Sequence, residues 1–184
     1  MKRLRLFLGI ACPPLAPVRK ALQTLRTSTI AQEGSLRAVR ESNLHVTLVF
    51  IGDLQADDFS GLVEHVQPVA ESIPAFDMTL QGSGRFARCL WIGAHLPDAV
   101  MRHALTLPDH VREAGWPVDT RSLRPHLTLA RFRERASTFA DNWQAQHCKQ
   151  YWGRVQVRHV HLFESRTGVD GPRYHIRHSF ALRS

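Results

Sequence analysis

Two short stretches of the chain repeat one pair of polar residues inside apolar runs. LHVTLVF carries His45 and Thr47, and PHLTLAR, 81 residues further on, carries His126 and Thr128. Residues two apart on a β-strand share a face, so each stretch predicts a strand that presents one imidazole and one hydroxyl together. Imidazole titrates near neutral pH, so one histidine can serve as general base and the other, protonated, as general acid. Threonine hydroxyls can hold phosphoryl oxygens, and the set suits in-line displacement at phosphorus without a metal.

The alternative for either histidine alone is a half-buried sheet residue that bonds to the backbone. Two copies in similar apolar contexts, one in each half of the chain, favour a functional role instead. The repeat also indicates a duplicated unit with pseudo-twofold symmetry, whose halves would face each other across a cleft.

Strands and helices interleave along the chain. Expected strands are residues 3–11, 37–40, the strand of His45 closed by Gly52-Asp53, 76–80, 89–94, the strand of His126, 154–165 and 174–182. Expected helices are residues 18–25, 56–72 and 97–115, the last kinked or split at Pro108. Residues 82–88 and 116–124 are expected connections, and 133–149 shows no clear pattern. The interleaving predicts an α+β fold with two sheets or one bent sheet, and the lack of a clear linker predicts one two-lobed domain over residues 1–184.

The charge balance favours an anionic partner. The 184 residues include 24 Lys and Arg against 16 Asp and Glu, a net charge of +8, and only three of the basic residues are lysines. Arginine is the better bidentate partner for phosphate, so nucleic acid is the first candidate, with a basic surface that has no specific partner as the equal alternative. Three scattered cysteines predict neither a zinc site nor a disulfide framework and fit a cytoplasmic protein. No run approaches the roughly 20 apolar residues of a membrane span.

The repeated motifs and the blocks around them resemble a known family. HVTL and HLTL look like the signature of the two-histidine phosphoesterase superfamily, and RLFLGIACPP, NLHVTLVFIGDL, FARCLWIG, RPHLTLAR and HLFESRTGVDGPRY look like its RNA 2′,3′-cyclic phosphodiesterases, once named 2′-5′ RNA ligases. The resemblance implies two pseudo-symmetric α+β lobes, each with an antiparallel sheet and helices, around a central cleft. It further implies hydrolysis of RNA terminal 2′,3′-cyclic phosphate to a 2′-phosphate, with reversible 2′-5′ RNA ligation.

The same resemblance assigns site residues. His45, Thr47, His126 and Thr128 match the catalytic quartet. Because a 2′-phosphate product requires cleavage of the P–O3′ bond, one histidine must protonate O3′ and the other must activate water; we expect His45 as donor and His126 as acceptor. Arg131 matches a phosphate- or nucleotide-binding position, although on an ideal strand it would point away from His126 and the cleft.

Aromatic residues and partners complete the expectations. Phe7 can stack a base or pack in the core, whereas Trp91 is expected in the core. We expect no metal and no cofactor, an RNA with a 2′,3′-cyclic phosphate end as partner, tRNA halves among the candidates, no membrane association and a monomer.

Other readings carry less. His159, His161, His175 and His178 could suggest a metal, but no acidic residue or cysteine stands at ligand spacing. GSGR at residues 82–85 lacks the lysine and following helix of a P-loop. The alternative functions are a phosphodiesterase for small cyclic nucleotides, cyclic ADP-ribose phosphate or 2′-5′ oligoadenylates, and an RNA-binding module without turnover.

Overall fold

A computed structural model describes residues 2–119, 123–134, 138–169 and 171–184. The strands are β1 Arg3–Ala11, β2 Leu36–Ala38, β3 His45–Gln55, β4 Phe76–Phe86, β5 Cys89–His95, β6 His126–Phe132, β7 Tyr151–Val157, β8 His159–Gly168 and β9 Gly171–Ala181. The helices are α1 Ala16–Thr27, α2 Thr29–Gln32, α3 Phe59–Ser72, α4 Asp98–Glu113 and α5 Thr138–His147, with short 3₁₀ turns η1 Glu41–Asn43 and η2 Ala56–Asp58. None of the helices in these described ranges is long and apolar enough to span a membrane.

The strands form one curled antiparallel sheet with two halves. Their order is β7-β4-β5-β6-β3-β1-β8-β9, and β2 pairs with β6 beside this path. The halves join where β3 meets β6, through the single pair of Val46 and Leu127. Each half therefore holds four strands of the path, β6-β5-β4-β7 in one lobe and β3-β1-β8-β9 in the other, with the two histidine strands side by side at the junction. The α+β fold with two related lobes is confirmed, as one bent sheet.

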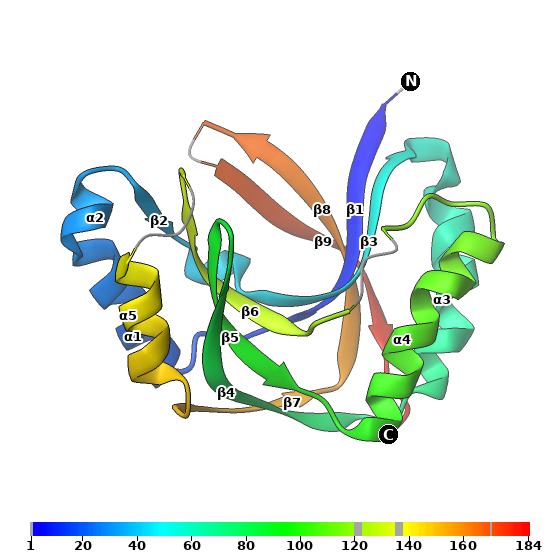
Figure 1. Ribbon diagram of the computed structural model, residues 1–184. Coiled ribbons are helices and arrows are strands. Elements are labelled where there is room, and N and C mark those ends of the chain that lie inside the picture. Colours follow the sequence, from blue (N-terminus) through cyan, green and yellow to red (C-terminus); the bar gives the residue numbers. More distant parts are fainter. Residues whose placement is uncertain (1, 120–122, 135–137, 170) are drawn as a thin grey trace.

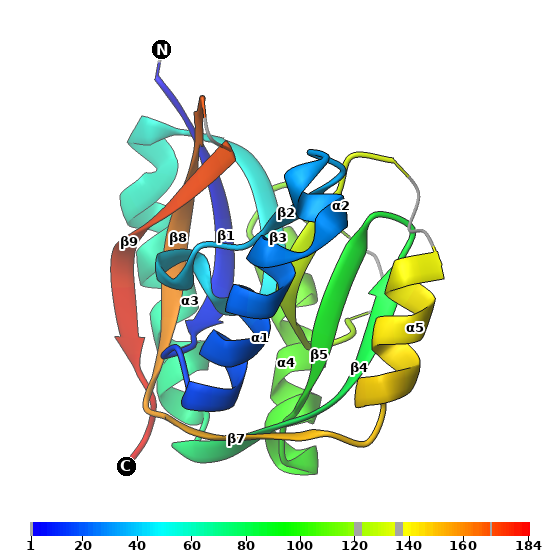
Figure 2. The same ribbon diagram turned by 90° about the vertical axis from the view of Figure 1, so that its left-hand side faces the viewer.

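The lobes do not coincide with the halves of the chain. β4 follows β3 and α3 in sequence but lies next to β5, and β8 follows β7 but lies next to β1. Helices α3 and α4 lie together on one side of the sheet, and α1, α2 and α5 lie on the other (Figures 1 and 2). The buried residues of α1 and α4 recur at helical spacing, which explains why periodicity located these helices.

Several sequence-based boundaries differ from the structure. Residues 154–165 are not one strand, since the chain leaves the first lobe after β7 and enters the second as β8, with Arg158 between them. Buried residues alternate at Val155 and Val157 and again at Val160 and Leu162, and the two consecutive exposed residues between these pairs, Arg158 and His159, mark the bend. Residues 82–86 belong to β4 rather than to a connection, and β3 continues past Gly52, at φ 88°, to Gln55. Helix α4 continues through Pro108, and α5 lies inside the stretch that showed no pattern.

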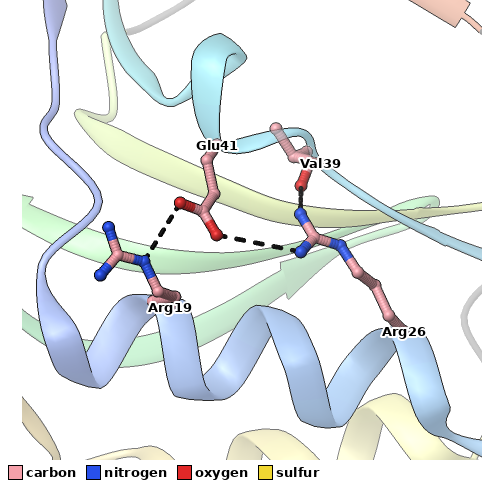
Figure 3. Close-up of polar contacts among 4 residues, drawn as sticks. All are labelled: Arg19, Arg26, Val39 and Glu41. Carbon is pink, nitrogen blue, oxygen red and sulfur yellow. Dashed lines mark hydrogen bonds and ion pairs between the residues drawn. The ribbon is translucent and has the colours of Figure 1, made fainter.

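The segment before His45 is held against α1. Glu41 of η1 accepts a hydrogen bond from Arg19 Nε at 3.2 Å and forms an ion pair with Arg26 at 4.0 Å, and Arg26 also donates to the Val39 carbonyl at 3.0 Å (Figure 3). Such partly exposed pairs contribute little free energy each. Their shared geometry fixes the path of residues 39–41 as the chain approaches β3.

Candidate active site

Both histidines face the space between the lobes. His45 begins β3 and His126 begins β6, and the residues that follow them, Val46 and Leu127, form the pair that joins the lobes and are fully buried. The four predicted residues are half-buried around this space, which we call the central cleft: His45, Thr47, His126 and Thr128.

Hollows open from the central cleft on both sides. One of about 450 Å³, the β2 hollow, is lined by His45 and Thr128 together with Arg131 and residues 37–40. Another of about 310 Å³, the α4 hollow, is lined by Thr47 and His126 together with residues of α4. Each of these two hollows is thus lined by the histidine of one motif and the threonine of the other.

The two imidazoles are oriented by the same backbone bond. His45 Nδ1 lies 2.7 Å from the carbonyl oxygen of Asn43, and His126 Nδ1 lies 2.7 Å from that of Arg124. Because a carbonyl only accepts, Nδ1 must carry the proton in both rings. The neutral tautomer therefore leaves both Nε2 atoms with a free lone pair for proton transfer.

Burial lowers the pKa of both histidines. Desolvation, which disfavours imidazolium, is the main cause of a pKa of about 4 for His45, and the charges of Arg131 and His126 add to it. Aromatic rings enclose His45: Tyr174 at 4.7 Å and Phe7 at 4.8 Å between centroids. The pKa of His126 is also lowered by burial and by Arg131. Both shifts favour the neutral imidazole.

The hydroxyl of Thr128 lies beside a buried thiol. The buried thiol of Cys89 donates to Thr128 Oγ1 at 3.6 Å. Burial raises the pKa of this thiol, so it stays protonated and remains a donor. The same thiol also lies 3.9 Å from the carbonyl oxygen of Leu90, a second acceptor.

A β-bulge turns Arg131 toward the cleft. In the register of β5 and β6, Trp91 pairs with Thr128 but Leu90 pairs with Ala130, so Leu129 is an extra residue in β6. An extra residue reverses the alternation, and Arg131 joins His45 and Thr128 in the wall of the β2 hollow. The regular alternation of an ideal strand predicted that Arg131 points away from the cleft, and this prediction was wrong.

The same bulge occurs in the first motif. Gly9 pairs with Thr47 but Leu8 pairs with Val49, so Leu48 is the extra residue of β3. Each bulge residue is the leucine that ends the motif, and Phe50 takes the place in β3 that Arg131 takes in β6. The sequence signal was the pair of consecutive apolar residues after each threonine.

The two aromatic candidates, Phe7 and Trp91, pack against His45 and His126 respectively. Phe7 is 3 % exposed and stacks on Phe163, with ring centroids 4.9 Å apart. This burial favours packing beneath His45 over direct stacking with a base, a role that stays a prediction. Trp91 packs against His126, at 6.0 Å between centroids, and its ring occupies the space where a Cβ on Gly84 would lie.

Asn43 connects the β8–β9 hairpin to the first motif, which sequence reasoning missed. Its buried side chain donates to the Pro172 carbonyl at 2.7 Å and accepts from the Tyr174 amide at 3.2 Å. Its own carbonyl is the one that orients His45. Asn43 thereby positions both His45 and the tyrosine ring beside it. No sequence signal marked this role, because the burial of Asn43 and its partners in the β8–β9 hairpin follow from the fold.

The remaining candidates lie elsewhere. His161 bonds Ser179 and stacks with His159, and His178 packs on Phe180. Within the described ranges no group of three or more histidines, cysteines or acidic residues could hold a metal ion. Within the expected connection 116–124, Arg121 and Ser122 lie outside the described residues.

A curled α+β sheet with one His-x-Thr pair per lobe at its junction is the arrangement of the two-histidine phosphoesterases. Residues 13–169 match the family model described as the 2′-5′ RNA ligase superfamily, and the chain belongs to this superfamily.

Characterised relatives and solved structures agree with this membership. The chain is 29% identical over 145 residues to the RNA 2′,3′-cyclic phosphodiesterase of Escherichia coli and 26% identical over 144 residues to that of Archaeoglobus fulgidus, in each case over 76% of this chain and 80% of the relative. A crystal structure titled as a phosphoesterase is 26% identical with a TM-score of 0.79, and the E. coli LigT complex with 3′-AMP is 25% identical with a TM-score of 0.79. Both cover 100% of each chain.

Proposed function

We propose that the protein hydrolyses RNA terminal 2′,3′-cyclic phosphates to 2′-phosphates without a metal. The observation that carries the proposal is the pair of imidazoles at the lobe junction, each with Nδ1 bonded to a carbonyl and Nε2 free. A module that only binds RNA needs fixed positive charge more than two titratable rings. A 2′-5′ ligation would be the same displacement with a ribose 5′-hydroxyl in place of water as the nucleophile.

The hollows suggest where each part of the substrate lies. The β2 hollow, beside His45, presents Arg37 and Arg131, and no carboxylate of a described residue lines it. The α4 hollow, beside His126, contains Asp109 and Asp119 together with Arg112 and Arg124, so its charges offset each other. An anionic nucleotide therefore fits on the His45 side, and water can enter from the His126 side.

This placement assigns the proton transfers. Water attacks phosphorus while its proton passes to His126 Nε2, the P–O3′ bond breaks, and imidazolium His45 gives the proton of Nε2 to O3′. Thr47 and Thr128 donate hydrogen bonds to the non-bridging oxygens, and Arg131 balances their charge. The bound phosphate anion favours the imidazolium that the empty site disfavours. The product carries a 2′-phosphate and a free 3′-hydroxyl, and His126 returns its proton to solvent.

A substrate panel tests the proposal. We expect wild-type protein in EDTA to convert a short RNA with a 2′,3′-cyclic phosphate end to the 2′-phosphate, which chromatography separates from the 3′-phosphate. Equal amounts of a mononucleoside 2′,3′-cyclic phosphate, cyclic ADP-ribose phosphate and a 2′-5′ oligoadenylate serve as competing substrates. Preferred turnover of one of these, or no turnover of the RNA, would contradict the proposal.

The pH profile of kcat/KM should be displaced to acid. One histidine must be protonated and the other neutral in the reacting complex, and the pKa of each lies below 6.5, that of His45 near 4. Above both pKa values the imidazolium fraction falls tenfold per pH unit, so we expect a bell-shaped profile with its maximum below pH 6.5 and a slope of about −1 above it. Steady-state rates with the RNA substrate, and circular dichroism to confirm folding at each pH, measure this. A plateau that extends to pH 8 would disagree with these pKa shifts.

A further inference from the structure

A third hollow opens from the central cleft on the side of β1 and β8. This β8 hollow, of about 460 Å³, shares His45, Thr47 and Arg131 with the candidate active site. Its outer part is lined by four further residues: Arg5, Phe50, Ser165 and Thr167. The proposed chemistry at a cyclic phosphate uses none of these four.

Strand alternation explains why these side chains converge. Arg5 and Phe7 lie two apart on β1 and share its cleft face, and Ser165 and Thr167 share a face of β8 with Phe163. The stacked rings of Phe7 and Phe163 bring the two faces together. Arg5 and Phe7 therefore line the same hollow, and Phe7 packs against His45.

Arg5 is held by an aromatic ring rather than by a carboxylate. Its guanidinium carbon lies 5.1 Å from the centroid of Phe50, the bulge-directed residue of β3. No described residue forms an ion pair with Arg5, and no carboxylate of the described ranges lines the β8 hollow. Ser165 and Thr167 make no side-chain hydrogen bond to a described residue. The guanidinium of Arg5 and the hydroxyls of Ser165 and Thr167 therefore have no acceptor among the described residues. They line a hollow that adjoins the proposed position of the reacting phosphate.

We propose that the β8 hollow is a second phosphate subsite, which binds the phosphodiester that precedes the terminal nucleotide of the RNA. The inference rests on the proposed function. A guanidinium with two hydroxyls matches the non-bridging oxygens of a phosphodiester, and the next phosphate of a strand lies one nucleotide from its cyclic end. A mononucleoside cyclic phosphate has no group for this subsite, so the subsite makes the protein selective for polynucleotide ends.

The test compares two substrates, of which only one has this phosphodiester. They are a dinucleotide ending in a 2′,3′-cyclic phosphate and the corresponding mononucleoside 2′,3′-cyclic phosphate. For Arg5→Ala we expect the ratio of kcat/KM for dinucleotide over mononucleotide to fall about tenfold, the loss typical of one charge-assisted hydrogen bond. The salt dependence of log kcat/KM for the dinucleotide should become shallower by about 0.7, the value for one phosphate contact to a single strand. Arg3→Ala, on the same strand but outside the hollow, should leave the ratio and the slope as in wild type.

The outcomes separate this inference from the proposed function. If Arg5→Ala lowers both substrates equally, or changes neither, the subsite is refuted. If wild type turns over neither substrate, the proposed function fails, and binding decides the subsite: calorimetry with the dinucleotide 2′-phosphate and the mononucleoside 2′-phosphate should show about tenfold weaker binding of the dinucleotide alone in Arg5→Ala. Unchanged dinucleotide affinity would then refute the subsite as well. Thr167→Val, which removes one hydroxyl at constant shape, should lower the same ratio or affinity by a smaller factor.

Discussion

Replacement of His45 or His126 by alanine is expected to lower kcat on RNA with a 2′,3′-cyclic phosphate end by about 10³-fold in each case. A positioned general acid or base contributes roughly 10² to 10⁴ in rate, and each ring is oriented for one proton transfer by its bond to a carbonyl. The double variant should lose much less than the product of the two factors, because the residues act in one concerted step.

The matched control is His159→Ala, an exposed histidine on β8 outside the three hollows. It should retain wild-type turnover, and thermal melting of all variants should show an intact fold. Retention of more than a tenth of wild-type kcat by either cleft variant would show that the histidine is a sheet residue without a role in proton transfer.

Arg131→Ala is expected to lower kcat/KM by about 10²- to 10³-fold, since it removes the cation beside the reacting phosphate. It should also move the pH profile toward higher pH. The charge of Arg131 lowers the pKa of both histidines, so its loss lets imidazolium persist to higher pH.

Arg133→Ala provides the control, because Arg133 is exposed just beyond the end of β6 and lines none of the three hollows. It should change neither the rate nor the pH profile. A normal kcat/KM in Arg131→Ala, or a rate loss without the shift in pH, would show that the bulge does not direct this guanidinium to the phosphate.

The repeated motif predicted the centre of the site because its meaning depends only on local alternation. A histidine and a threonine two apart on a strand share a face whatever the rest of the sheet does. The residue five places after each histidine could not be placed in the same way. Its direction depends on an extra residue in the strand, at Leu48 and Leu129, and a bulge is defined by the register of the neighbouring strand.

The missed elements have the same origin in long-range contacts. The sequence predicts residues 154–165 as one strand, but their pairing with β4 and then β1 divides them between the lobes, and the change of parity between Val157 and Val160 is the local trace of this division. Asn43 lies between two expected strands, and its partners Pro172 and Tyr174 lie about 130 positions away in sequence. Helix α5 buries only Ala140 and Trp143 among its residues, too few for a clear period.

The most direct test of two histidines in opposite roles across one phosphate uses a cyclic substrate in which sulfur replaces the bridging O3′. A thiolate leaves without protonation, so the loss of the general acid costs little with this substrate, whereas the loss of the general base remains. We expect His45→Ala to approach wild-type kcat within about tenfold on the sulfur substrate and His126→Ala to stay impaired by about 10³-fold. Equal impairment of both variants on the sulfur substrate, or rescue of His126→Ala instead, would contradict the assignment of these two residues.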